Sequence, residues 1–394
     1  MNNEIKAILK FPKKFLWGSA TASYQVEGEI KNNDWYLEAL KNSSRVPFVD
    51  NRINHYEKYP EDFKMAADLN QNCQRISLEW SRIEPIENHF DEEAIEHYRQ
   101  VIREIKKNGM EPFITLWHFT LPDWFYKKGA FTNKNSPLIF ENYCSHVLSK
   151  LGKEAKFWET INEPNVWASN GYMRGIWPPF KHNPVKYFRA LKNMAKGHNL
   201  IYWENKRKYN INIGVAKDNI NFRTDIFPWN MVLRSWGDYL WNHYFLKMVS
   251  KQLDHIGLNY YFDSFIGRKP KWYKQLPKND MGWTLSPEGI FHVLRDLKKY
   301  KKPIYITEAG LADAQDRYRQ QYLQDLLIQV HKAILFDVDV RGFMHWSLID
   351  NFEWAQGYDK KFGLVEILEN GERKIRKSAY FYADICRDNE LKIK

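Results

Sequence analysis

Two glutamates, Glu163 and Glu308, are the residues of this sequence best suited to carry out chemistry. Each follows a run of β-branched and aromatic residues, in Glu159–Pro164 and in Ile304–Glu308. A carboxylate at the end of an apolar strand is costly to remove from water unless it is paired or used in catalysis. An ion pair with a nearby arginine or lysine would explain either glutamate alone. Two carboxyls facing each other across a pocket would instead supply the proton donor and the nucleophile or base of glycoside hydrolysis.

Other polar and aromatic side chains lie within, at the end of or just after these and similar runs. They are Gln25, Arg75, His118, Asn162, Asn259, Tyr261 and Trp346. Amides, a histidine, a tyrosine and a tryptophan together suit the binding of a ligand with hydroxyl groups and a flat face. A structural role in the core explains some of them singly, but their shared position at the ends of runs favours a common binding site.

These residues need elements that bring them together, and the sequence alternates between two kinds of segment. Short runs predicted as strands are Phe15–Ala22, Cys73–Trp80, Glu111–Phe119, Lys156–Pro164, Ile211–Lys217, His255–Tyr261, Pro303–Gly310 and Val340–Asn351. Longer segments with helical apolar spacing between them include Glu92–Lys107, Phe140–Leu151, Val185–Glu204, Pro287–Leu297 and Tyr318–Phe336. Eight such repeats predict an α/β fold, a single (β/α)8 TIM barrel that forms one domain over residues 1–394.

An open, doubly wound sheet is the competing fold. The sequence has no G-x-G-x-x-G after the first strand and no P-loop, so the usual support for a nucleotide-binding sheet is missing. In a closed barrel, the carboxyl ends of all strands meet at one face, where reactive residues lie. The fourth and seventh strands stand on opposite sides of the ring, so Glu163 and Glu308 are expected to face each other across its mouth.

Amino-acid composition and net charge limit the functional classes to which this sequence can belong. Among 394 residues there are 16 Trp, 23 Tyr and 24 Phe, which suits a large core and a site that stacks a flat ligand. Lys and Arg number 59 against 48 Asp and Glu, a net charge of +11, but the lysines are spread along the chain. We therefore predict a solvated surface and no nucleic-acid binding, and leave open a weak peripheral attraction to a membrane.

Apolar segments, the N-terminal residues and the cysteines indicate where in the cell the protein is expected. No segment approaches the roughly 20 apolar residues that a membrane span requires, and Met1–Trp17 does not resemble a secretion signal. Cys73, Cys144 and Cys386 are far apart and lack the spacings of a zinc site. We predict reduced thiols in a cytoplasmic protein that has no transmembrane segment and no metal site.

Four segments resemble the signatures of family 1 glycoside hydrolases, the retaining β-glucosidases and β-galactosidases, especially the shorter archaeal-type members. They are Phe15–Gly28, Thr160–Pro164, Ile306–Glu308 and Trp346–Trp354. Their order is that of the family, and the resemblance spans nearly the whole chain. It implies a retaining exo-β-glycosidase that hydrolyses β-D-glucosides, and also galactosides and fucosides, without a metal or organic cofactor.

The resemblance also implies roles for individual residues. Glu163 would be the general acid and base, and Glu308 the nucleophile that forms a covalent glycosyl-enzyme. Arg75 and Tyr261 would hold Glu308 ionised and oriented. Asn162 would bind the 2-hydroxyl of the sugar.

The sugar-binding set follows from the same resemblance. Its hydroxyl-binding members would be Gln25, His118, Asn162, Glu353 and Trp354, with Trp346 stacking on the sugar and Phe362 closing the far end. Glu353 stands where members that act on 6-phosphorylated sugars have a phosphate-binding pattern, which disfavours phosphorylated substrates.

Several positions depart from the family pattern. Ala309 follows the nucleophile in place of Asn, which would loosen the positioning of Glu308. Phe119 and Asn165 each replace a tryptophan of many relatives, Asn165 at a position that faces the leaving group. The loops after the fifth and sixth strands are short and carry Trp229, Trp236, Trp272 and Trp283, so we expect these rings around a shortened, more open rim.

Two alternatives use the same residues. A carbohydrate-binding or membrane-attached barrel with impaired chemistry would keep the pocket but lose turnover. A transglycosylase would use both glutamates and differ only in the acceptor.

Overall fold

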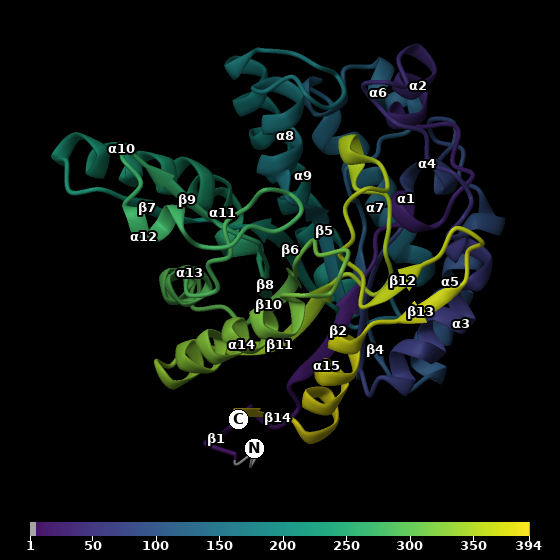
Figure 1. Cartoon of the computed structure of the whole chain (residues 1–394). Coiled ribbons are helices and arrows are strands. Elements are labelled where there is room, and N and C mark those ends of the chain that lie inside the picture. Colours follow the sequence, from purple (N-terminus) through teal and green to yellow (C-terminus); the bar gives the residue numbers. More distant parts are fainter. Residues whose placement is uncertain (1–4, 394) are drawn as a thin grey trace.

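The computed structural model describes residues 5–393, and eight parallel strands close into a barrel at its centre (Figure 1). In order around the ring they are β2 (Leu16–Ala20), β3 (Cys73–Ser77), β4 (Glu111–Thr115), β5 (Phe157–Asn162), β6 (Asn212–Asp218), β8 (His255–Tyr260), β10 (Ile304–Ala309) and β11 (Val340–Trp346). All eight coincide with predicted runs, so the predicted barrel is confirmed.

Most helices surround the barrel. The helices are α1 (Ser23–Val26), α2 (Asp34–Lys41), α3 (His55–Asp68), α4 (Trp80–Ile83), α5 (Glu92–Lys107), α6 (Asp123–Lys127), α7 (Ser136–Leu151), α8 (Pro164–Tyr172), α9 (Pro184–Tyr209), α10 (Pro228–Asp238), α11 (Tyr244–Val249), α12 (Lys271–Lys274), α13 (Gly289–Leu297), α14 (Arg319–Leu335) and α15 (Lys377–Asp388). Helices α10 and α12 do not surround the barrel but lie in a lobe that projects from it (Figure 1). The five predicted helices correspond to α5, α7, α9, α13 and α14.

Helix α5 shows why these segments fold as predicted. The Asp91 side chain accepts hydrogen bonds from the backbone N–H groups of Glu93 and Ala94, at 2.9 and 3.0 Å, and so caps the helix start. Lys107 in the last turn complements the helix dipole. The buried residues recur at helical spacing, so one face of α5 packs against the barrel.

Most predicted strands end later than the observed ones; β6, which ends at Asp218, is the exception. Strand β3 stops at Ser77, and Trp80 already begins helix α4. Strand β11 likewise stops at Trp346, before the loop that the sequence pattern joined to it. Residues that follow the strands stay buried because they line the barrel mouth, and burial alone does not distinguish a strand from a buried loop.

The two ends of the barrel differ in chemistry. Near the amino ends of the strands, Phe113, Phe157, Tyr305 and Met344 form an apolar cluster inside the ring. The polar residues singled out in the sequence lie at the other end, at or beyond the carboxyl ends of the strands. The apolar cluster closes the bottom, so a site can form only at the mouth.

Three strand pairs lie outside the barrel. Strand β1 (Ala7–Lys10) pairs antiparallel with β14 (Glu390–Ile393), which brings both ends of the described chain together below the barrel (Figure 1). Strand β7 (Asn221–Thr224) pairs parallel with β9 (Asp263–Ile266), and β12 (Val365–Ile367) antiparallel with β13 (Arg373–Ile375).

The three cysteines are buried and form no disulfide. Among residues 5–393, no helix combines the length and the apolar character needed to cross a bilayer.

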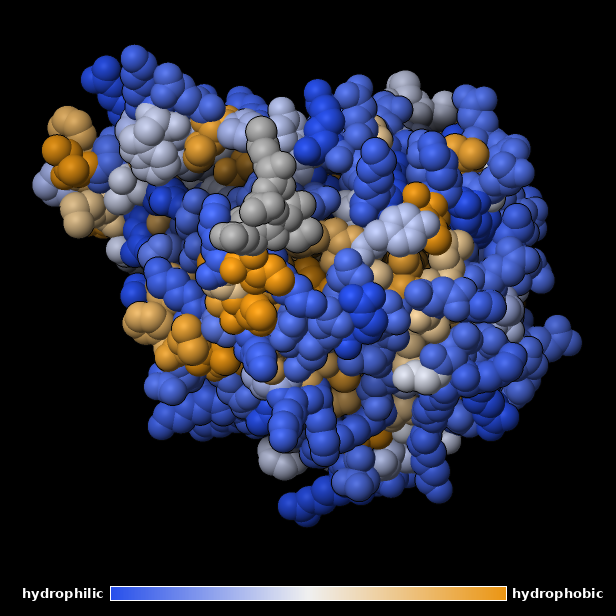
Figure 2. Space-filling model, turned by 60° about the horizontal axis from the view of Figure 1, so that its bottom comes forward, coloured by the Kyte–Doolittle hydropathy of each residue, from blue (hydrophilic) through white to orange (hydrophobic). Residues whose placement is uncertain are grey.

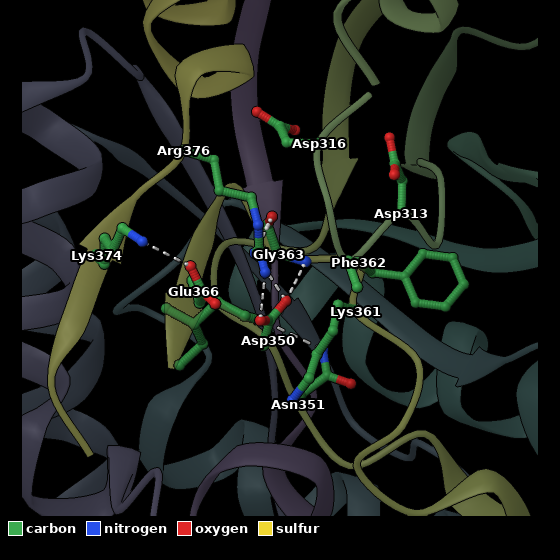
Figure 3. A network of polar contacts seen from close by, with 12 residues as sticks. Asp313, Asp316, Asp350, Asn351, Lys361, Phe362, Gly363, Glu366, Lys374 and Arg376 are labelled. Carbon is green, nitrogen blue, oxygen red and sulfur yellow. Dashed lines mark hydrogen bonds and ion pairs between the residues drawn. The ribbon is translucent and has the colours of Figure 1, made fainter. Parts of the chain in front are cut away.

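A buried ion pair anchors the loop after β11 (Figure 3). The Arg376 guanidinium donates to both carboxylate oxygens of Asp350, at 2.9 and 2.8 Å, and to the carbonyl of Gly363 at 2.8 Å. The N–H of Gly363 in turn donates to Asp350. Both charged side chains are nearly inaccessible to solvent. The pair therefore joins the segment before α15 to the two ends of a loop that forms part of the barrel mouth.

We predict that Arg376→Met lowers the free energy of unfolding by about 3–5 kcal/mol, because it leaves the Asp350 carboxylate buried without its partner. Lys374→Met is the matched control. Lys374 pairs with Glu366 at 3.4 Å on the surface, with its side chain 67% exposed, and its loss should cost less than about 1 kcal/mol. Urea unfolding of both variants measures the difference, and equal losses would contradict a special role of the buried pair.

Candidate active site

Arg75 lies at the centre of the barrel mouth and is fully buried. Its guanidinium donates to three acceptors: Glu159 at 2.8 Å, Asn162 at 2.8 Å and Glu308 at 2.5 Å. Burial lowers the pKa of Arg75, but the two carboxylates outweigh that effect and raise it, so the side chain stays charged. One cation thus joins side chains from β3, β5 and β10.

Glu308 is held on both carboxylate oxygens. Arg75 contacts one oxygen, and the Tyr261 hydroxyl donates to the other at 2.6 Å. Burial raises the pKa of Glu308, while the charge of Arg75 and the hydrogen bond from Tyr261 lower it and oppose the rise. The carboxylate therefore has two strong donors that favour its ionised form and fix its direction.

Glu163 has a different environment. It follows β5 with φ of 44° and ψ of 62°, a left-handed conformation that bulky residues rarely adopt, and Pro164 then starts α8. Its carboxyl accepts one hydrogen bond, from Asn259 at 2.8 Å. Burial raises its pKa well above the ordinary value, and the charges of Glu308 and Asp218 raise it further. Glu163 consequently holds its proton more strongly than Glu308.

Asn162 and His118 form a connected pair. The Asn162 oxygen accepts from Arg75 and from Asn259, so its amide nitrogen points to His118 Nε2 at 3.1 Å. Burial lowers the pKa of His118 well below its ordinary value, and Arg75 adds to this effect. We assign a neutral ring that accepts at Nε2 and carries its proton on Nδ1, which is buried and has no partner among the described residues.

A cavity of about 550 Å³ opens above these groups. All sequence-predicted sugar-binding residues line it, together with Glu163, Glu308 and Tyr261. The His118 ring is nearly parallel to the rings of Trp346 and Trp354, with a centroid distance of 6.0 Å to each. Phe362 packs near Tyr261 at 6.0 Å. The cavity therefore combines flat apolar walls with polar groups at its base, as a pocket for a sugar requires.

Two polar residues of the wall remain available to a ligand. Gln25 donates through its amide nitrogen to the carbonyl of Phe352 at 2.7 Å, while its buried oxygen has no partner among residues 5–393. Burial and the charge of Glu308 raise the pKa of Glu353 to about 8. The protonated Glu353 carboxyl offers a donor as well as acceptors, whereas the ionised form only accepts.

Glu159 was not predicted as a site residue. It occupies the middle of β5, where it accepts from Arg75 and from the Thr115 hydroxyl. Gly257 permits this position, because a side chain there would collide with a Glu159 oxygen. A charged residue inside an otherwise apolar strand was the available signal, since such a charge needs a buried partner.

Lys217 and Asp218, at the end of β6, were also missed. They form a buried ion pair with 2.9 Å between Lys217 Nζ and an Asp218 oxygen. Asp218 lines the cavity, and its charge raises the pKa of Glu163, whereas the charge of Lys217 lowers it. The pair therefore helps to set the protonation of Glu163.

Some expectations about the rim were wrong. Asn165 is buried and donates to the carbonyl of Trp241 at 3.2 Å, so it does not line the cavity. Of the four tryptophans expected around the rim, Trp283 lines the cavity, but Trp229, Trp236 and Trp272 lie exposed outside it. The segment that carries them turns outward from the barrel.

Phe119 and Ala309, which also depart from the family pattern, lie in different environments. Phe119 lines the cavity, with φ of 72°, and packs against Trp354 at 5.1 Å. Ala309 is fully buried in β10 and belongs to the main apolar core. Arg75 and Tyr261 hold Glu308 directly.

A cluster that resembles a metal site lies away from the cavity. Asp238, His243 and Asp296 come together, but Lys299 Nζ lies 3.0 Å from both His243 Nε2 and an Asp296 oxygen. The lysine already supplies the positive charge that a metal ion would bring.

The chain is similar to several known proteins over its whole length. The model of glycosyl hydrolase family 1 matches residues 8–222 and 237–391. Beta-glucosidase A of Thermotoga maritima is 30% identical, and the match covers 98% of this chain and 99% of that protein. Beta-galactosidase of Sulfolobus acidocaldarius is 27% identical, with 98% and 96% covered. The solved structure of a beta-glycosidase from Pyrococcus horikoshii has a TM-score of 0.91 at 35% identity, with 98% and 97% covered.

We predict that Asp218→Asn lowers the pKa of Glu163. The substitution removes a negative charge that raises this pKa and leaves the opposing charge of Lys217 unbalanced. Infrared spectra of the protonated carboxyl band across a pH titration measure the effect, with Glu163→Gln identifying the band. Asp337→Asn, at a side chain that is 93% exposed, is the control. An unchanged titration in Asp218→Asn would contradict the role of the ion pair.

Proposed function

Because the chain belongs to glycosyl hydrolase family 1, and is thus a retaining glycoside hydrolase, we propose that Glu308 is its nucleophile and Glu163 its general acid and base. The contrast between the two carboxyls supports these roles. Glu308 has a cation and a hydroxyl donor, whereas Glu163 has one amide donor and neighbouring negative charges. A nucleophile must be ionised and an acid must be protonated in the same site.

In the first step, a Glu308 oxygen attacks the anomeric carbon and the bond to the leaving oxygen breaks as Glu163 donates its proton to that oxygen. The ester that forms removes the charge of Glu308, which otherwise raises the pKa of Glu163. Glu163 then stays ionised and can accept a proton from water. The water oxygen attacks the anomeric carbon, the ester bond breaks, and Glu308 returns as a carboxylate.

The proposed substrates are β-D-glucosides and β-D-galactosides. Both beta-glucosidases and beta-galactosidases are among the relatives of this chain. Two groups on the cavity wall, Gln25 Oε1 and His118 Nδ1, have no partner among residues 5–393, and they supply an acceptor and a donor for sugar hydroxyls. Asn162, Glu353 and Trp354 complete the proposed hydroxyl-binding set, with Trp346 stacking on the sugar ring and Phe362 closing the far end.

The cellular location of the protein and its number of domains are also proposals. We propose a cytoplasmic location, supported by three buried cysteines without a disulfide. We also propose that the chain forms one domain, supported by the single closed barrel.

We predict that Glu308→Gln lowers kcat for a nitrophenyl β-glucoside by roughly four orders of magnitude, because an amide cannot form the glycosyl ester. Release of nitrophenol measures the rate. Glu111→Gln, at the opposite end of the barrel in β4, should retain normal turnover. Full activity of the Glu308 variant would exclude its assignment as nucleophile.

We predict that Glu163→Ala slows hydrolysis of an alkyl β-glucoside by about 10²–10⁴-fold, since the poor leaving group needs a proton. Formation of the glycosyl-enzyme from a dinitrophenyl glucoside should change far less, as shown by a pre-steady-state burst. The alkaline limb of kcat/KM should also disappear, because it reports the loss of the Glu163 proton above its raised pKa. Equal slowing of both substrates, with the limb intact, would count against the acid role.

A further inference from the structure

A lobe projects from the barrel beside the cavity mouth (Figure 1). This side lobe consists of β7, α10, β9 and α12, together with the loops that join α10 and α12 to the strand pair. Strand β7 begins just after Asn219 and Ile220, which line the cavity, and β9 follows Phe262, which also lines it. The side lobe is therefore continuous in the chain with one wall of the pocket.

The outer surface of the side lobe is strongly apolar. None of the residues of α10 is buried. Ile226 is 91% exposed and Trp229 73%, and the other large exposed apolar residues are Phe227, Met231, Val232, Leu233, Trp236, Tyr239 and Trp272. In Figure 2, apolar side chains gather at the left edge of the molecule, where this lobe lies. Monomeric proteins in water rarely expose so large a group of apolar side chains unless it contacts something.

Hydrogen bonds fix the backbone beneath this exposed surface. The Asp225 carboxylate accepts from the backbone N–H of Phe227 at 3.1 Å and from that of Arg268 at 2.7 Å, so it ties the start of α10 to the loop after β9. Arg234 donates to the carbonyl of Phe222 at 3.0 Å. These bonds hold the inner side of α10 against the strand pair and keep its tryptophans turned outward.

A basic segment adjoins the apolar helix. Between Gly267 and Lys278 the sequence carries no acidic residue, and it has the exposed cations Arg268, Lys269, Lys271, Lys274 and Lys278. Trp272 lies in their midst and is 54% exposed. Tryptophan next to lysine and arginine, beside an amphipathic helix, is the composition of segments that lie in the interface of an anionic bilayer.

The apolar helix is not part of the shared family pattern. The family model stops at residue 222 and resumes at 237, so it leaves out nearly all of the exposed apolar segment. The barrel and the cavity residues lie within the matched ranges. The surface of α10 is thus a feature of this chain that the common chemistry of the family does not require.

We propose that the side lobe docks on the surface of an anionic lipid bilayer, with the α10 side chains in the interfacial layer and the basic segment on the lipid headgroups. A second copy of the chain fits less well, because a two-fold contact through this patch would bring two basic segments together. A nucleic acid would not use Ile226, Met231 or Leu233. This docking goes beyond the proposed function and does not depend on it.

Docking in this way would hold the cavity mouth beside the bilayer. The walls formed by Asn219, Ile220 and Phe262 continue into the side lobe. A β-glycoside whose leaving group is embedded in the lipid would then reach the pocket from the membrane.

The test is co-sedimentation of the full chain with vesicles. We expect binding to phosphatidylcholine vesicles that contain about a third phosphatidylserine, and weaker binding to pure phosphatidylcholine. Trp229→Ser/Trp236→Ser should reduce binding roughly tenfold or more, because two interfacial anchors are lost. Lys269→Gln/Lys271→Gln/Lys274→Gln should remove most of the preference for the anionic lipid and its dependence on salt.

The matched control is Trp203→Ser. Trp203 is 64% exposed near the end of α9, which leads to the start of β6 at the opposite end of the barrel. This variant should bind vesicles as the unchanged chain does, and all variants should keep the same thermal unfolding and aryl-glycoside turnover. No binding by the unchanged chain, or equal binding by the tryptophan pair variant, would overturn the proposal. So would a dimer in light scattering that the tryptophan pair variant abolishes and that excludes vesicles.

Discussion

The buried guanidinium of Arg75 is the interaction on which the site depends. A charge without access to water is tolerated only when acceptors surround it, and here Glu159, Asn162 and Glu308 do so. Because these acceptors come from two further strands, one side chain sets the relative position of three walls of the barrel. Two carboxyls share one cation, so the base of the pocket carries net negative charge when both are ionised. Such a charge favours the positive character that develops on a sugar ring during glycosidic cleavage.

The same arrangement separates the properties of two similar carboxyls. Glu308 lies inside this network, while Glu163 lies at its edge, with Asn259 as its donor and the Lys217–Asp218 pair behind it. Burial acts on both, so the difference arises from the partners. The left-handed backbone at Glu163 contributes to this difference. It turns the side chain into the cavity at the point where β5 ends and α8 begins.

Sequence reasoning predicts the barrel well, because each strand is a short apolar run and each run carries its polar residue at the same end. It also predicts residues that line the cavity, since the signature segments are contiguous. It fails where burial depends on partners far away in the chain. Glu159 looks like one more residue of a strand until Arg75 is seen beside it. Asn165 and Trp229 follow the pocket segments closely in sequence, yet one turns into the wall and the other into solvent, and spacing alone does not encode that choice.

The pairing of β1 with β14 has a practical consequence. Ala7 stands opposite Ile393, so the first and last described residues lie close together. Both described ends emerge on the side away from the pocket. A short linker could join these ends, and new ends could be opened in a surface loop with the strand order unchanged. A tether attached at either end would likewise leave the mouth facing outward, which suits immobilisation on a solid support.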